Sequence, residues 1–261
     1  MEIAQGTHFL LPLSDLSREA GNLALLWIPP GTFLMGREDA VTPVDPFDAD
    51  EHQFELTITK GYWLGQYLVT QAQWQSIMAH NPSKFSELSP DCPVENINWY
   101  QAKSFCEALN RRFVGDLPPE YKFNLPTEAQ WEYACRAGTQ SKYYSGSTVE
   151  DLSRAAWHKG NSSGHTHPVG QKDPNRWNLY DMLGNVFEWC YDSPLDYPTS
   201  PAIDWAGNND DHLRNFRGGS WSTNPTDPSI CCFARGYGDP NAERPWFGLR
   251  LALTIELINA S

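Results

Sequence analysis

Helical patterning is confined to the first half of the chain, and this limits the folds that the sequence can adopt. Three segments repeat apolar residues at helical spacing. These segments are 70–81, 98–113 and 125–138. The first and third begin at Thr70 and Thr127, residues that can cap a helix N-terminus. From 139 to 261 the sequence predicts only short strands and loops.

The composition favours an irregular fold around an aromatic core. The 261 residues include 11 Trp, 11 Tyr and 12 Phe, together with 19 Gly and 20 Pro. Aromatic side chains supply a large buried area, while glycine and proline favour turns. The chain has no internal repeat or linker, so we expect one domain at 23–261. We expect an N-terminal extension with a short helical piece at 1–22.

The net charge of −13 restricts the partners that the protein can bind. Nucleic acids and anionic membranes require a basic surface, so we expect neither as a partner. No window approaches the ~18 uninterrupted apolar residues of a membrane-spanning helix, which predicts no membrane insertion. The N-terminus has no basic n-region and no small-residue cleavage site, which favours a cytoplasmic protein with mostly reduced thiols.

Seven segments of the sequence, in a fixed order, carry a family signature. They are IPPGTFLMG, YLVTQAQW, CPVENINWYQAKSFCEALN, LPTEAQWEYACRAGT, HPVGQKDPNRWNLYDMLGNVFEWCYD, FRGGSW and FGLRLAL. Together they resemble the sulfatase-modifying factor family, whose namesake is the formylglycine-generating enzyme. The resemblance implies an α+β protein with the irregular C-type-lectin-like fold of that enzyme. Such a fold has few helices, short antiparallel strands and long loops.

The resemblance also implies a calcium site in the apolar segment LYDMLGNVFEWC, residues 179–190. Carried over by position, Asp181 and Glu188 would supply carboxylates, and Gly184 and Val186 would supply backbone carbonyl oxygens. Calcium takes about six to eight oxygen ligands and combines both kinds. The alternative is that Asp181 caps a turn and Glu188 pairs with an arginine.

The copper site of the family enzyme has no counterpart in this sequence. That enzyme oxidises a substrate cysteine to formylglycine with oxygen and with copper held by two cysteines after the GGS-aromatic motif. Here the two positions fall on Thr223 and Pro228, or in another register on Ser222 and Asp227. Without thiolates there is no soft site for Cu(I). We therefore expect that the protein binds no copper. The absence of the cysteine pair favours a protein that is not an enzyme over one that is.

Three other residue pairs could carry chemistry. The family resemblance implies that Cys135, on the third predicted helix, lies beside Cys232 on a C-terminal strand. Neighbours on a strand point to opposite faces, so we expect one buried and one exposed thiol in the Cys231–Cys232 pair. His165 and His167 offer two imidazoles to a metal, but no third ligand lies near them in the sequence.

The C-terminal segment also resembles the variable proteins of diversity-generating retroelements, which share this fold family. Its anchors include RGGSW at 217–221 and GLR at 248–250, and the residues between them have no consistent chemistry. A rigid frame with arbitrary exposed residues suits a diversified ligand surface. We therefore expect the loops at 222–247 to bind a ligand. The predicted contact residues are Ser222, Thr223, Thr226, Asp227, Tyr237, Asp239 and Trp246.

The sequence thus favours a non-oxidase ligand-binding protein whose ligand is an unidentified protein or small molecule. Tolerant loop positions in any family member would give the same pattern, so the residues alone do not prove diversification. Two alternatives stay open. One is a family enzyme with altered oxidase chemistry, and the other is an interaction module of a bacterial conflict or signalling system.

Overall fold

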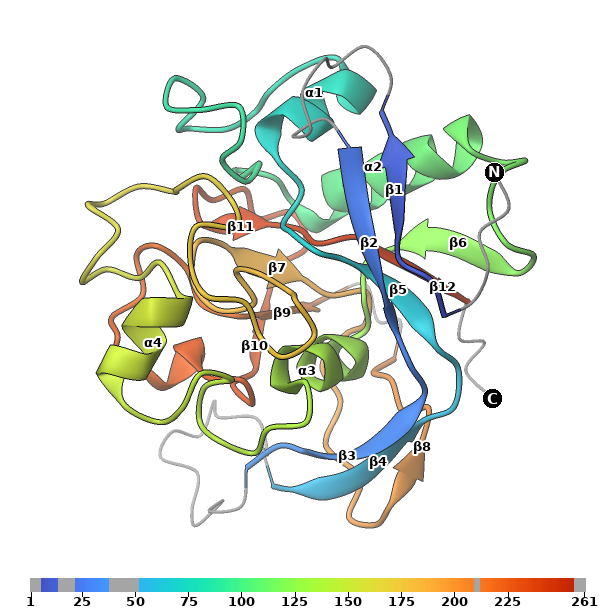
Figure 1. Ribbon diagram of the computed structural model, residues 1–261, viewed down its shortest axis with the longest axis vertical. Coiled ribbons are helices and arrows are strands. Elements are labelled where there is room, and N and C mark those ends of the chain that lie inside the picture. The colour runs from blue at the N-terminus through green and yellow to red at the C-terminus, as the bar shows by residue number, and fades with distance from the viewer. Residues whose placement is uncertain (1–5, 14–21, 38–51, 209–211, 256–261) are drawn as a thin grey trace.

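The computed structural model describes residues 6–13, 22–37, 52–208 and 212–255 of the chain. Within these ranges it contains four α-helices, a short 3₁₀-helix and three small β-sheets, so the protein is α+β as predicted. Figure 1 shows helices α1 and α2 beside one sheet, and α3 near the middle of the molecule.

The first sheet brings both ends of the domain together. Its strands, in spatial order, are β1 (Phe9–Pro12), β2 (Asn22–Ile28), β5 (Tyr62–Gly65), β12 (Ala252–Ile255) and β6 (Tyr121–Asn124). All neighbouring strands in it are antiparallel. Because β12 pairs with β5 on one side and β6 on the other, the C-terminal strand lies inside the sheet.

The extension predicted at 1–22 contributes to this sheet. β1 pairs with β2 as the edge strand, and Leu11 and Leu13 are buried in the core. The predicted helical piece is not found within the described residues 6–13, where a strand with alternate residues buried forms instead. Residues 1–5 and 14–21 of the extension lie outside the described part.

The other two sheets lie on either side of α3. One has the order β10 (Gly236–Gly238), β9 (Arg214–Arg217), β7 (Phe187–Trp189) and β11 (Phe247–Gly248). The other consists of β3 (Gly31–Met35), β4 (Phe54–Ile58) and β8 (Ala202–Ile203). The pairs β7–β11 and β4–β8 are parallel, and the remaining pairs are antiparallel. The short antiparallel strands that the resemblance implied are therefore present, with two parallel pairs added.

The three predicted helices are confirmed. They are α1 (Gln71–Met78), α2 (Trp99–Arg112) and α3 (Glu128–Arg136). Their N-caps Thr70, Asn98 and Thr127 each accept a backbone hydrogen bond from a glutamine three residues on, whose side chain bonds back to the cap. This reciprocal capping uses only local sequence, which explains why the starts were predictable. No helix in the described part of the chain is long and apolar enough to cross a membrane.

A fourth helix, α4 (Val149–Ala155), contradicts the prediction that only strands and loops follow residue 139. Thr148 and Asp151 form the same reciprocal cap at its start. The signal was present in the sequence, but the helix has only 7 residues and buries just Leu152 and Ala155. Its apolar periodicity is too short to indicate a helix by itself.

Helix α3 is the central element of the domain. Every one of its residues is buried, although it includes Glu128, Glu132 and Arg136. It contacts β3 on one side and β9 on the other. Charged side chains are rarely buried without partners, so the surroundings of these three residues determine how the C-terminal half packs.

Candidate functional site

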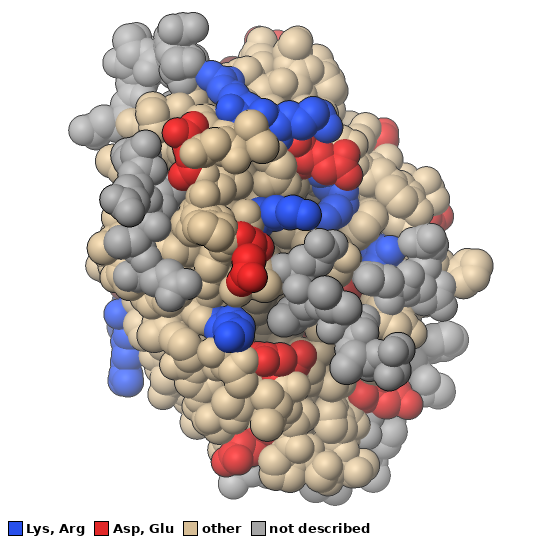
Figure 2. Space-filling view, turned by 90° about the vertical axis from the view of Figure 1, so that its right-hand side faces the viewer, with Lys and Arg blue, Asp and Glu red and all other residues tan. Residues whose placement is uncertain are grey.

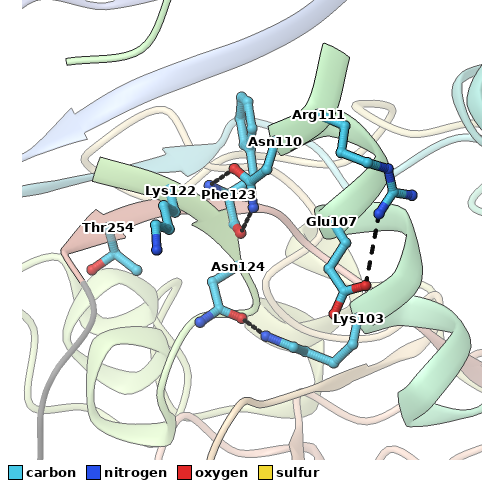
Figure 3. A pocket seen from close by; sticks show the side chains of 8 residues that line it. All are labelled: Lys103, Glu107, Asn110, Arg111, Lys122, Phe123, Asn124 and Thr254. Carbon is cyan, nitrogen blue, oxygen red and sulfur yellow. Dashed lines mark hydrogen bonds and ion pairs between the residues drawn. The ribbon is translucent and has the colours of Figure 1, made fainter. Parts of the chain in front are cut away.

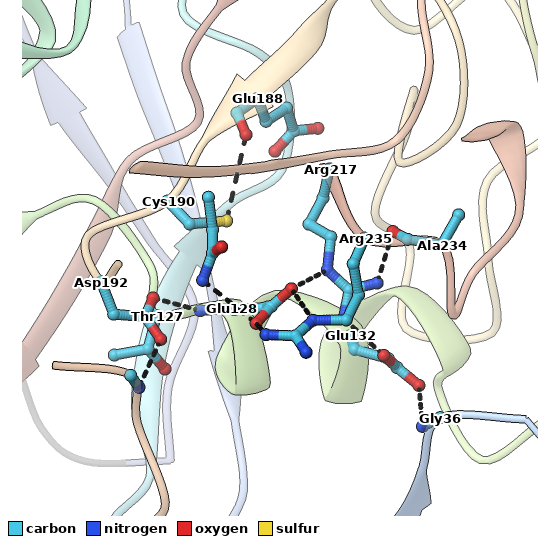
Figure 4. A network of polar contacts seen from close by, with 12 residues as sticks. Gly36, Thr127, Glu128, Glu132, Glu188, Cys190, Asp192, Arg217, Ala234 and Arg235 are labelled. Carbon is cyan, nitrogen blue, oxygen red and sulfur yellow. Dashed lines mark hydrogen bonds and ion pairs between the residues drawn. The ribbon is translucent and has the colours of Figure 1, made fainter. Parts of the chain in front are cut away.

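Five charged side chains are buried together behind the C-terminal loops. They are Glu128, Glu132, Arg136, Arg217 and Arg235, and Figure 4 shows the contacts around Glu128 and Arg217. Arg217 on β9 places Nε 3.1 Å from Oε1 of Glu128 and Nη2 2.5 Å from Oε2 of Glu132. Arg235 places Nη2 2.8 Å from Oε2 of Glu128. The two glutamates of α3 therefore hold two arginines from the C-terminal half of the chain.

Glu128 is ionised in this environment. Burial alone would raise its pKa, but Arg235 and Arg217 outweigh that effect and leave the pKa below its ordinary value. Asn215 also donates to Oε2 of Glu128 over 3.1 Å. The carboxylate is thus fully partnered, which is the condition under which a buried charge is tolerated.

Arg217 closes the base of the loop that follows it. Its Nη1 donates to the carbonyl oxygen of Ala234 at 2.7 Å and to that of Cys232 at 3.3 Å. Gly219, two residues after Arg217, has φ of +77°, and a Cβ there would lie 2.6 Å from Cγ1 of Ile230. The Arg217 guanidinium therefore holds both ends of the loop. Gly219 lets the chain pass close to Ile230, on the returning side of the loop, without a steric clash.

A second buried ion pair fixes the other border of the C-terminal segment. Arg250 places Nη2 2.9 Å from Oε1 of Glu188, and Trp131 Nε1 donates to Oε2 of Glu188 over 2.8 Å. Arg250 also donates to the carbonyl oxygens of Gly65 and Tyr180, each at 2.8 Å. The pair joins β7, α3 and the C-terminal strand region. Glu188 thus pairs with an arginine, as expected in the alternative to calcium binding.

The four residues predicted to bind calcium lie in one buried segment. Asp181 accepts the N–H of Gly170 at 2.8 Å, and burial raises the pKa of Asp181 to about 6. Gly184 has φ of +75° and a Cβ there would lie 2.3 Å from the carbonyl oxygen of Trp157. Val186 is fully buried. Among the described residues, no group of three or more His, Cys, Asp or Glu side chains is arranged to hold a metal.

The predicted ligand residues differ in exposure. Thr226 and Asp239 are exposed, and Ser222, Tyr237 and Trp246 are half-buried. Tyr237 lies on β10, opposite Asn215 of β9. Trp246 packs against the apolar core beneath it, so only part of its ring can meet a ligand.

Two of the predicted ligand residues hold the loop in shape. Thr223 is buried, and its Oγ1 accepts the N–H of Ser220 at 3.0 Å, so its predicted exposure is wrong. Asp227 is half-buried and caps the 3₁₀-helix Pro228–Ile230 by accepting the N–H of Ser229 at 2.9 Å. Both are hydrogen bonds from backbone N–H groups to side chains within a turn. The sequence prediction treated these residues as exposed loop positions and did not include such bonds.

An aromatic neighbour of this loop was missed in the sequence. Trp221 packs edge-on against Phe85, with the ring centroids 5.4 Å apart. Ser162 Oγ donates to the carbonyl oxygen of Trp221 at 2.8 Å, and Lys159 N–H donates to that of Thr223 at 2.9 Å. The loop is therefore tied to two segments distant in sequence, and no local pattern indicates such contacts.

The cysteine pair implied by the family resemblance is confirmed. Sγ of Cys135 lies 3.5 Å from Sγ of Cys232, and both residues are fully buried as free thiols. Cys232 lies in a turn after the 3₁₀-helix rather than on a strand. Cys231 is fully buried as well, so the prediction of one exposed thiol is wrong. The opposite-face rule applies only to extended backbone, which this turn is not.

The two histidines are engaged with the backbone. A ring nitrogen of His165 lies 2.8 Å from the carbonyl oxygen of Thr166, and one of His167 lies 2.8 Å from that of Ser162. The ring of His167 stacks on Trp157 with centroids 3.7 Å apart. These contacts give both imidazoles a structural role.

Residues 14–255 match the sulfatase-modifying factor enzyme 1-like domain, which is nearly the whole chain. The chain belongs to this family. It is 29% identical to the chaperone protein LppX of Paenibacillus barcinonensis over 73% of this chain and 79% of that protein. It is 30% identical to the formylglycine-generating enzyme of Streptomyces coelicolor over 66% of this chain. That match spans 56% of the enzyme, little more than half its length.

A solved structure extends the likeness of this sulfatase-modifying factor family member. Treponema denticola variable protein 1 superposes with a TM-score of 0.82 and 27% identity, covering 95% of this chain and 99% of that one. The irregular C-type-lectin-like fold of the formylglycine-generating enzyme type is therefore confirmed.

We predict that Glu128→Gln lowers the free energy of unfolding by about 3–5 kcal/mol, because it removes the counter-charge of Arg235 and leaves Arg217 to share Glu132 with Arg136. Urea denaturation at neutral pH measures this. The difference from the wild type should shrink below about pH 4, because the stability contributed by a carboxyl of depressed pKa is lost as it is protonated.

Glu107→Gln is the matched control. Glu107 pairs with Arg111 at 4.0 Å on the surface, where both side chains are mostly exposed. We expect a cost below about 1 kcal/mol. If both variants lower the free energy of unfolding equally, the buried network contributes no more to stability than a surface ion pair.

Proposed function

We propose that the protein is a ligand-binding protein without oxidase activity, which presents the loops at 222–247 on a formylglycine-generating-enzyme-like scaffold. The observation that carries this proposal is the closure of the loop by Arg217, which bonds to the carbonyl oxygens of Cys232 and Ala234. The frame is fixed from beneath by buried ion pairs, while Thr226 and Asp239 face solvent. The likeness over 95% of this chain to Treponema denticola variable protein 1, which is described as a variable protein, supports this proposal.

The chemistry of the loop argues for a non-oxidase. At the positions of the family's copper ligands stand Thr223 and Pro228, or Ser222 and Asp227. Ser220 Oγ lies 3.0 Å from Ser222 Oγ and 3.2 Å from Thr223 Oγ1, so hydroxyl groups bonded to one another occupy this place. Hydroxyl oxygens are poor ligands for Cu(I), which prefers thiolates.

A copper-loaded preparation given a sulfatase-type cysteine peptide and oxygen should form no formylglycine, because no thiolate pair stands in the loop. Mass spectrometry of the peptide checks this. The formylglycine-generating enzyme of Streptomyces coelicolor, run in parallel, provides the positive control. Formylglycine formed at a rate that depends on copper would overturn the non-oxidase part of the proposal.

The ligand surface is tested by replacing Ser222, Thr226, Tyr237 and Asp239 together with alanine. None of the four side chains is fully buried or belongs to the buried ion pairs, so Tm should fall by less than about 4 °C. A partner that co-purifies with the wild type from the source cell, identified by mass spectrometry, should be lost with this variant.

The control replaces four other exposed residues with alanine. They are Glu55, Lys60, Arg111 and Glu120. This control should keep both Tm and the partner. If the two variants lose the partner equally, or if the loop variant unfolds, the loops are not a display surface.

Diversification of this surface has a test of its own in the genome. A reverse-transcriptase gene should lie near the coding sequence, with a second copy of the stretch that encodes 222–247. The two copies should differ only where the template has adenine. A neighbourhood with neither feature would restrict the proposal to a fixed ligand surface.

We also propose calcium binding at Asp181, Gly184, Val186 and Glu188. Support comes from Asp181, which is buried with one short hydrogen bond and so keeps lone pairs for a hard cation. Glu188 would have to share its oxygens between calcium and Arg250.

Excess chelator should lower Tm and added calcium should restore it, because a ligand that binds only the native state stabilises it. Asp181→Asn should abolish this response. An unchanged melting curve in chelator, with no calcium found by elemental analysis of the purified protein, would contradict the calcium proposal. The segment would then be fixed by the Glu188–Arg250 pair without a metal.

A further inference from the structure

A cavity of about 450 Å³ shares no described lining residue with the loop at 222–228 or with the proposed calcium site. It is bordered by the end of β3, the last turn of α3 and the loop at 140–142. Phe233, which follows the buried Cys232, forms a further wall. The volume of the cavity is within the range of small-molecule sites, roughly 300–1,000 Å³.

The decisive feature of this cavity is the guanidinium of Arg136. The residue is 2% exposed, its Nε donates to Glu132 at 2.9 Å, and its Nη2 donates to the carbonyl oxygen of Gly36 at 2.6 Å. Its Nη1 is buried and has no hydrogen-bond partner within the described residues. A buried charged donor without an acceptor is costly, and such groups indicate a site for water or a ligand.

The lining of the cavity favours an anion. Arg37 and Lys142 line it together with Arg136, and no acidic side chain is among its described lining residues. Glu132, the acidic residue nearest to Arg136 in this network, is already neutralised by Arg136 and Arg217. In a protein with a net charge of −13, three of the described residues that line this one cavity are cations.

The same cavity offers groups for the rest of a ligand. Gln53 and Gln140 add amides that can donate or accept hydrogen bonds. Leu34 and Phe233 provide apolar surface. A ligand with an anionic group and an apolar part would match this arrangement.

A second groove provides a comparison. Figure 3 shows it between α2 and β6, where Lys103, Arg111 and Lys122 line a cavity of about 430 Å³. Here Glu107 pairs with Arg111, and Lys103 donates to Asn124. On this side of the molecule, basic and acidic side chains are interspersed (Figure 2). The groove thus has a similar number of cations but contains its own counter-charge.

We propose that the cavity at Arg136 binds the oxyanion group, carboxylate or phosphate, of a small organic molecule. Arg136 donates Nη1 to the oxyanion, Arg37 and Lys142 add positive charge, and the apolar part packs against Leu34 and Phe233. The proposal is independent of ligand binding by the exposed loops, because it rests on a different cavity.

Isothermal titration calorimetry with phenyl phosphate and with benzoate, at physiological salt, tests this. The two probes share an aromatic ring and differ in the anionic group, so they distinguish phosphate from carboxylate. Saturable binding of at least one is expected. Arg37→Gln/Lys142→Gln should weaken that binding about tenfold or more, because it removes two of the three positive charges that border the oxyanion. These positions are chosen because Arg136 also holds Glu132 and Gly36.

Lys103→Gln/Lys122→Gln in the second groove is the matched control, because it removes the same two positive charges. It should leave the affinity unchanged. The proposal is overturned if neither probe binds saturably to the wild type, or if both double variants weaken binding equally. Unchanged binding in Arg37→Gln/Lys142→Gln would also overturn it.

Discussion

The rest of the C-terminal half depends on the burial of Arg217 between Glu128 and Glu132. A guanidinium without access to water must find acceptors for its donors, and here they come from α3 and from the carbonyl oxygens of Cys232 and Ala234. Few arrangements of helix, strand and loop bring these four acceptor residues to one guanidinium at once. A buried ion pair is weak evidence for high stability, so we infer that its role here is to select one geometry of the loop base.

The second ion pair, Glu188 with Arg250, applies the same principle at the other end of the segment. Trp131 joins the two networks, because it lies on α3 between Glu128 and Glu132 and donates to Glu188. Both borders of the loops at 222–247 are thus attached to one fully buried helix. Side chains such as Thr226 and Asp239 can then change without disturbing the charges beneath them, which is what a binding surface of variable chemistry requires.

Arg136 connects this buried frame to a cavity. It is the third arginine around Glu132 and Glu128, and its Nη1 has no hydrogen-bond partner in the described structure. The cation is fixed by Glu132 and by the carbonyl oxygen of Gly36. A preorganised donor of this kind loses little conformational entropy on binding an anion. The same network therefore shapes the loop face and the proposed oxyanion cavity.

The sequence by itself determined the family, the α+β class and the starts of the three main helices. Capping by Thr70, Asn98 and Thr127 involves residues three positions apart, so a local pattern contains the whole interaction. Only the tertiary structure decided that Glu188 meets Arg250, 62 residues away, and that Arg217 meets Glu132, 85 residues away. It also decided that Thr223 and Cys231 are buried, because their exposure depends on a turn fixed by distant partners. Local hydrogen bonds can be read from spacing, whereas the pairing of buried charges depends on which surfaces the whole chain brings together.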